Sequence, residues 1–228
     1  MSLWKQLQIP LLVLTCANVL LVFGRSILDP TIGKQTVTPF VFPSVVPLAQ
    51  WQPIASQPLK NKTVDRAPFG KLVLPGRHYR YIQNNLPLDI KIRYEVQTTG
   101  DVKEFIRREG GIQLSLNQPL LVVRENERVG FYGLFVHDKR AYLDACINPN
   151  GGSTFTKEQF SYNRIHYDIQ FNRLFPWLLG QQRLRDQRCL WTHLSIPLNK
   201  SSPQSAYVIL ENAWFSWYQW WRPRFPKP

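Results

Sequence analysis

The chain has 228 residues, enough for one domain with a targeting or anchoring segment and too few for two domains with independent cores. Its content of 44% hydrophobic and 13% aromatic residues excludes a disordered chain. The formal net charge of +13 suits a partner that carries phosphates, anionic lipid headgroups or acidic polymers. No nucleic-acid-binding motif accompanies this charge, so we expect no nucleic-acid partner.

An uncharged apolar run occupies residues 7–23, between Lys5 and Arg25. As a helix it would span about 26 Å, close to the thickness of a bilayer core. No small-residue cleavage site follows, which favours a retained signal anchor over a cleaved signal peptide. The sequence therefore predicts a single-pass anchor in the plasma (inner) membrane within residues 1–25, with the bulk of the chain extracytoplasmic, on the periplasmic side. The alternative is a buried helix of a soluble protein.

Residues 26–75 are rich in proline and contain no run long enough for a helix. Apolar residues between the prolines indicate that part of this segment lies against the following domain in extended form. We therefore expect a linker or extended arm over this range.

Residues 76–201 contain patterns of both strands and helices. Residues 88–97 alternate apolar and charged side chains without error, which predicts a strand with one buried face, and 77–82 is its expected partner. Three further strands at 120–124, 129–136 and 141–147, joined by short turns, predict an antiparallel meander. Helical segments follow from Lys157, and 188–197 reads as a strand covered on both sides. The expected domain is α+β, with a mainly antiparallel sheet and flanking helices.

Residues 202–228 predict a Trp-rich C-terminal helix and a basic tail. Ser202 can cap this helix, and Pro203 suits its first turn. Aromatic residues recur along it at intervals of three and four, which forms a single stripe. The stripe either faces the core or contacts a membrane or a partner protein. The candidate contact residues are Tyr207, Trp214, Trp217, Trp220, Trp221, Arg222 and Arg224.

Two cysteines, Cys146 and Cys189, lie in the expected extracytoplasmic domain, and the third, Cys16, lies in the anchor. An even number of cysteines in an oxidising compartment favours a disulfide between them. The alternative is a Cys146 nucleophile, with Arg164 stabilising an oxyanion. Its base would be one of three histidines, His137, His166 or His193.

Other catalytic and cofactor patterns are missing. The four histidines have no metal-ligand spacing, and no CxxC, GxGxxG or P-loop motif is present, so we expect neither a metal nor a cofactor. The carboxylates available for glycoside hydrolysis are few: Asp144, Glu158, Asp168 and Glu211. These patterns favour a protein without enzymatic activity.

Six segments together resemble the cyanoexosortase A system-associated proteins of cyanobacteria. In chain order they are GRHYRYIQ (76–83), LDIKIRY (88–94), GFYGLFV (130–136), CINPNGGST (146–154), RCLW (188–191) and ENAWFSWYQWW (211–221). The segment from Cys146 is also similar to the Cys-x-x-Pro-Gly-Gly region of exosortase-associated domains. Here, however, Asn150 precedes the glycine pair and no Trp follows it.

The resemblance implies a membrane-anchored, non-catalytic accessory of an exosortase, the enzyme that processes proteins with a PEP-CTERM-type sorting signal. Its partners would then be the membrane, an exosortase and the sorted substrates. Two alternatives remain at this point: a Cys146-dependent processing enzyme of the same pathway, and a module that binds acidic exopolysaccharide through the basic surface.

Overall fold

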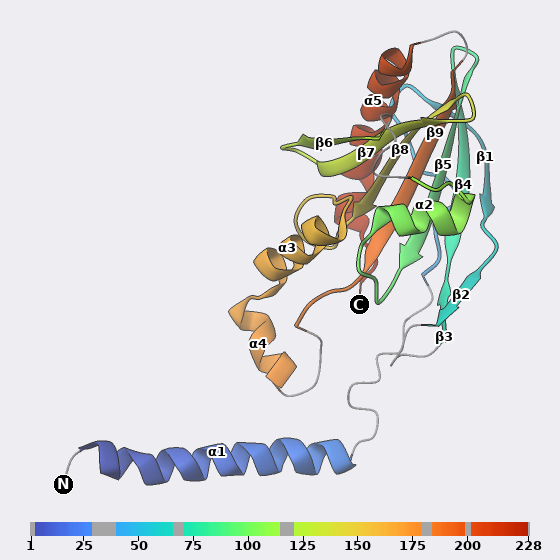
Figure 1. Cartoon of the computed structure of the whole chain (residues 1–228). Helices are drawn as coiled ribbons and strands as arrows, with labels where there is room; N and C mark the ends of the chain where they lie inside the picture. The colour runs from blue at the N-terminus through green and yellow to red at the C-terminus, as the bar shows by residue number, and fades with distance from the viewer. Residues whose placement is uncertain are drawn as a thin grey trace. The chain divides into compact units, whose positions relative to one another are not determined.

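The computed structural model describes residues 3–28, 40–65, 71–114, 121–178, 184–198 and 202–227. The chain divides into two compact units, each described here by itself. The helical unit comprises Met1–Val37 and Ile169–Arg185, and it contains α1 (Leu3–Leu28) and α4 (Phe171–Leu178). The sheet unit comprises Thr38–Asp168 and Asp186–Pro228, and the described strands all belong to it (Figure 1).

Helix α1 covers the apolar run that predicted a transmembrane anchor at residues 7–23. In the ranges given above, no helix combines the length and the apolarity needed to cross a membrane, so the predicted anchor is wrong. Polar side chains interrupt the apolar surface of α1. The Thr15 hydroxyl donates to Leu11 O at 2.7 Å, and the Asn18 amide donates to Leu14 O at 2.7 Å.

A seven-stranded antiparallel sheet forms the centre of the sheet unit, with strand order β1-β4-β5-β9-β8-β7-β6. Its strands are β1 (Gln52–Pro58), β4 (Gly76–Gln83), β5 (Leu86–Glu95), β6 (Val122–Asn126), β7 (Gly130–His137), β8 (Arg140–Ile147) and β9 (Cys189–Pro197). A separate two-stranded sheet pairs β2 (Lys62–Asp65) with β3 (Lys71–Leu74). The large antiparallel sheet with flanking helices is therefore present.

The register of the sheet gives each face a different chemistry, because residues directly opposite in antiparallel strands point to the same side. One row across β4, β5, β9, β8 and β7 consists of Tyr79, Ile90, Leu194, Leu143 and Leu134. The next row, on the other face, consists of His78, Lys91, His193, Asp144 and Gly133. One face is thus apolar, and the other carries polar groups at its centre.

Helix α5 (Pro203–Trp221) covers the apolar face, where it packs on β8 and β9. The Ser202 hydroxyl accepts from Ser205 N at its start, and Pro203 occupies the first turn, as the sequence predicts. The indole of Trp217 lies 5.4 Å from the ring of Tyr79, and Trp221 packs on Phe42. The aromatic stripe of α5 is therefore the side of the helix that meets the core.

Helix α2 (Val102–Gly110) covers part of the polar face. The Asp101 side chain caps its N-terminus by accepting from Lys103 N. At its C-terminus Gly111 adopts φ 68°, a left-handed conformation that glycine allows without strain. Phe105 packs on Trp191 in a buried cluster that also contains both disulfide cysteines.

Before helix α3 (Lys157–Asp168), the chain runs back alongside β7 and β8. A capping box begins the helix: the Thr156 hydroxyl accepts from Gln159 N, and the Gln159 side chain accepts from Phe155 N and Thr156 N. The helix start predicted near Lys157 is thus explained by local hydrogen bonds.

The arm expected over residues 26–75 contains strands that the sequence did not predict. Phe42, Val46, Leu48 and Trp51 are buried, so this part of the arm contributes to the core of the sheet unit. Strand β1 pairs with β4 at the sheet edge despite two prolines, which an edge strand tolerates because one of its sides needs no N–H donors.

Candidate functional site

The centre of the polar face holds a buried pair, His193 and Asp144, on adjacent strands. The side chain of Asp144 has no exposed surface, and its carboxylate accepts from Trp191 Nε1 at 3.0 Å. Nδ1 of His193 lies 2.9 Å from the other carboxylate oxygen. Because a carboxylate only accepts, Nδ1 carries a proton that it donates to Asp144. Burial raises the pKa of Asp144, and the contacts from His193 and Trp191 oppose that rise.

Asp144 orients the imidazole ring of His193, which is one requirement of a catalytic base. The second requirement is a nucleophile bonded to that ring. Ser195 lies two residues further along β9 on the same face, but its hydroxyl accepts from Arg140 Nη2 at 2.9 Å. Among the residues that the structure describes, no hydroxyl or thiol is hydrogen-bonded to His193. The arrangement therefore supports a structural role for the pair.

A second polar cluster surrounds Asp89 on β5. Its carboxylate lies 2.9 Å from His78 Nε2 and accepts from Arg140 Nη2 at 2.7 Å. The hydrogen bond with His78, together with the charge of Arg140, lowers the pKa of Asp89, although partial burial acts in the opposite direction. Since Arg140 also reaches Ser195, this cluster connects β4, β5, β8 and β9.

A third cluster ties α2 to both sheets. The guanidinium of Arg93, almost fully buried, donates to Leu74 O at 2.7 Å and to Glu109 at 2.9 Å. Lys62 of β2 lies 3.2 Å from the same carboxylate, and Arg108 pairs with buried Glu95. Burial acts to raise the pKa of Glu109, but Arg93 and Lys62 outweigh it, so the net shift is downward. These ion pairs fix α2 in place.

A disulfide joins Cys146 of β8 to Cys189 of β9, with Cα atoms 5.7 Å apart and neither residue exposed. Of the two roles that the sequence left open, the structure shows the cross-link. A cystine sulfur is not a thiolate, so in this state Cys146 offers no nucleophile.

The structure does not bring together the other residues of the predicted thiol site. Arg164 is buried on α3, where it donates to Asn150 O at 2.6 Å and pairs with Asp168 at 3.3 Å. His166 is exposed, and its ring stacks parallel to Tyr162 at 5.9 Å. His137 is exposed beside Asp138. Arg164 therefore holds the loop before α3, and the two histidines lie at the surface.

Three of the four carboxylates considered for glycoside hydrolysis are held by different partners. Asp144 contacts His193, Asp168 contacts Arg164, and Glu211 accepts from Arg124 at 2.9 Å and from the Tyr132 hydroxyl at 2.8 Å. Glu158 is exposed at the start of α3. Within the described ranges, no group of three or more His, Cys, Asp or Glu residues could hold a metal ion.

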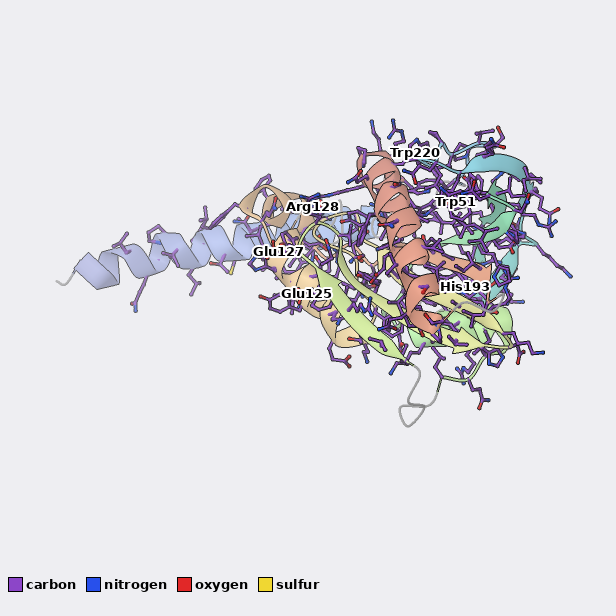
Figure 2. The ribbon with its side chains drawn as sticks, turned by 90° about the horizontal axis from the view of Figure 1, so that it is seen from above. Trp51, Glu125, Glu127, Arg128, His193 and Trp220 are labelled. Carbon is purple, nitrogen blue, oxygen red and sulfur yellow. A yellow bond between two sulfur atoms is a disulfide. The ribbon has the colours of Figure 1, made fainter. Side chains whose placement is uncertain are left out.

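Four of the predicted contact residues on α5 are buried: Tyr207, Trp214, Trp217 and Trp221. The prediction of a contact surface is therefore wrong for these four, because the stripe packs on the sheet. Trp220, labelled in Figure 2, is half-buried, and the Arg224 guanidinium lies 4.6 Å from its ring centre. Arg222 and Arg224 are exposed.

The sequence prediction missed an exposed apolar surface on α3. Tyr162, 70% exposed, and Ile165 lie on this side of the helix with His166, at positions separated by three and four residues. The spacing shows in the sequence that these residues share one side of a helix, but it does not show that this side faces solvent. Helix α4 of the helical unit also exposes large apolar side chains, namely Phe171, Phe175 and Trp177.

No protein-family model matches the chain, and neither a curated protein nor a solved structure matches it.

Proposed function

We propose that this chain is a non-catalytic, extracytoplasmic accessory protein of an exosortase sorting system, acting through protein–protein contact. The six ordered segments noted above support the system. The Cys146–Cys189 disulfide supports the compartment, because disulfides persist in oxidising environments and are rare in the cytosol.

The observation that carries the proposal is the exposed apolar side of α3. Tyr162 and Ile165 face solvent, and the ring of Tyr162 stacks on that of His166. Tyrosine is enriched among the hot-spot residues that contribute most of the binding energy at protein interfaces, because it combines a large ring with a hydroxyl group. Large exposed side chains gathered on one side of a helix are a candidate contact site.

The opposite side of α3 is fixed by polar contacts, which makes the exposed side a rigid platform. Arg164 donates to Asn150 O, and Asn163 Nδ2 donates to Gly152 O at 2.7 Å. The Tyr218 hydroxyl of α5 donates to Gly151 O at 3.3 Å and so ties the same loop to the core. A preorganised surface loses little conformational entropy on binding.

Site-specific photo-crosslinking in the native host tests the proposal directly. A photoreactive residue at Tyr162 should give a cross-link to the exosortase, and the same residue at Val41, which is 84% exposed elsewhere in the sheet unit, should not. Equal cross-linking from both positions, or none to the exosortase from Tyr162, would contradict the proposal.

Substitution of the same surface gives an independent test. The variant Tyr162→Ser/Ile165→Ser should lose co-purification with the exosortase, whereas Val41→Ser should retain it. Both variants should keep the wild-type melting temperature because the substituted side chains are exposed.

Thiol labelling of the protein from cells lysed under denaturing conditions tests the compartment. Cys146 and Cys189 should react with a maleimide only after reduction and denaturation, while Cys16, the free cysteine, serves as the positive control. If Cys146 and Cys189 reacted in unreduced, denatured protein, the extracytoplasmic assignment would be wrong.

A further inference from the structure

A hollow of about 280 Å³ lies where the segment 44–46 crosses β1 and β4. Its walls are mostly apolar and include Val45, Pro53 and Ile54, and Tyr79 and Tyr81 also line it. Val45 and Ile54 are each 58% exposed, so apolar surface remains uncovered at this point.

The hollow is preformed by hydrogen bonds and by an irregularity in β1. The Tyr79 hydroxyl donates to Pro43 O at 2.7 Å, and the Tyr81 hydroxyl donates to Val46 O at 2.8 Å. Both bonds hold the segment 43–46 above the sheet. In β1 the register shifts between Pro53 and Ala55, so Ile54 has no Cα partner in β4 and its side chain lines the hollow.

Arg77 gives the hollow a positive charge. Its Nε donates to the Ser56 hydroxyl at 2.7 Å, and its guanidinium lies 6.0 Å from the ring centre of Tyr79. In the part of the chain that the structure describes, no carboxylate forms an ion pair with Arg77. Arg80, the other arginine that lines the hollow, differs because its Nε lies 3.6 Å from the Asp89 carboxylate.

We propose that this hollow binds a carboxylate attached to a small apolar group, with Arg77 contacting the carboxylate and Val45 and Ile54 contacting the apolar group. Nε of Arg77 is held by Ser56, which leaves the two Nη groups to bind a carboxylate in the bidentate manner that guanidinium favours. The volume lies just below the range of about 300–1,000 Å³ typical of drug-sized ligands, so the group is small.

The same chemistry occurs in the C-terminal residue of a peptide and in a free short-chain carboxylic acid. A peptide can in addition extend along β1 as a further strand, because β1 is an edge strand that pairs only with β4 among the described strands. This inference is independent of the contact surface proposed on α3, because the two sets of residues do not overlap.

Calorimetric titration of the full chain tests the site with three probes. These are the pentapeptide Ala-Ala-Ala-Ala-Val with a free C-terminus, the same peptide as its C-terminal amide, and isovalerate. We expect the free acid to bind at least ten-fold more tightly than the amide. Binding of isovalerate as tight as that of the peptide would identify a free carboxylic acid as the ligand, and much weaker binding would identify a peptide terminus.

Variants distinguish this site from general attraction to a basic protein. Arg77→Gln should reduce binding of the free acid at least ten-fold, whereas Arg107→Gln, at an exposed arginine on α2, should leave it unchanged. Ile54→Glu places a like charge at the lip of the hollow on an exposed side chain, and it should abolish binding in a folded protein. Equal binding of acid and amide, equal effects of the two arginine variants, or no saturable binding at millimolar peptide would overturn the proposal.

Discussion

His193 and Asp144 lie directly opposite each other on β9 and β8, with Nδ1 of the histidine 2.9 Å from the carboxylate. The pair lies at the middle of the seven-stranded sheet and also holds the indole of Trp191 through the second carboxylate oxygen. Its partners are thus all internal, which is the arrangement of a pair that fixes the packing of a core.

Removing one member of this pair should destabilise the protein strongly. His193→Phe leaves the Asp144 carboxylate buried without its partner, and we expect a loss of about 3–5 kcal/mol in the free energy of unfolding, measured by urea denaturation. The double variant Asp144→Leu/His193→Phe should recover part of that loss because no unpaired charge remains. Additive losses in the double variant would show that the two side chains do not interact.

The disulfide predicts equal effects of its two cysteines. Cys146→Ala and Cys189→Ala break the same cross-link between residues 43 positions apart, so each should lower the free energy of unfolding by about 2–5 kcal/mol. Association with the exosortase should be affected equally by both variants. Loss of association with Cys146→Ala alone would instead indicate a role for that thiol.

The burial of the α5 stripe predicts a sharp difference between two neighbouring tryptophans. Trp217→Ala opens a cavity against Tyr79 and should cost about 3–5 kcal/mol, measured by thermal or urea unfolding. Trp220→Ala removes a half-buried ring that contacts Trp221 edge-on, and it should cost no more than about 1.5 kcal/mol.

The burial of α5 against the sheet also predicts the result of a C-terminal truncation. Deleting residues 202–228 should unfold the sheet unit rather than release a folded domain, because Trp214, Trp217 and Trp221 fill the core over β8 and β9. A cooperative unfolding transition in the truncated protein would contradict this placement of α5.

The sequence predicts strands well where one face is apolar and the other polar. The alternation over 88–97 correctly locates β5, but the expectation of a single buried face is wrong at its end, where Arg93 and Glu95 are buried by their ion pairs with α2. The pattern over 188–197 corresponds to β9, which is covered on both sides. Both patterns depend only on local spacing, so they can be read without knowledge of the fold.

The pairing of Asp144 with His193 could not be predicted in this way. The two residues are 49 positions apart, and only the register of β8 and β9 brings them together. Strand β1 was missed because prolines disfavour a central strand, and its position at the edge is a property of the whole sheet.

Helix α3 shows why periodicity alone does not identify the buried side of a helix. Its buried side contains Phe160 and three polar residues, Asn163, Arg164 and Asp168, whereas Tyr162 and Ile165 face solvent. The polar side chains are buried because they bond one another and the loop before the helix. An apolar stripe in the sequence would ordinarily be assigned to the core.

The close approach of Phe155 to β7 predicts that Gly133 tolerates no side chain. A Cβ atom at Gly133 would lie 2.2 Å from Phe155 Cε2, within a buried cluster that cannot move outward. Gly133→Ala should therefore cost about 1–3 kcal/mol by overpacking, measured as the free energy of unfolding. Gly110→Ala is the control: its Cβ would make only ordinary contacts at 3.5 Å, so the loss should be smaller.

The lowered pKa of Asp89 predicts how the free energy of unfolding depends on pH. Its folded pKa is lower than its unfolded value because His78 and Arg140 bind the charged form. Below the unfolded value of about 3.9, the unfolded chain therefore binds the proton more readily than the folded protein. The stabilisation from Asp89 is thus complete above that pH and is lost as the pH falls through the folded pKa.

Urea unfolding of the wild type and of Asp89→Asn between pH 2.5 and 6 measures this contribution, the range being set about the unfolded carboxylate value. At pH 6 the wild type should be more stable by about 1–3 kcal/mol, because the variant loses charged hydrogen bonds at a half-buried site. The difference should shrink as the pH falls, since protonated Asp89 loses the same bonds. Arg140→Gln removes one of the charged partners of Asp89, so its difference from the wild type should shrink over the same pH range. A difference between wild type and Asp89→Asn that stayed constant down to pH 2.5 would show that the cluster does not favour the charged carboxylate.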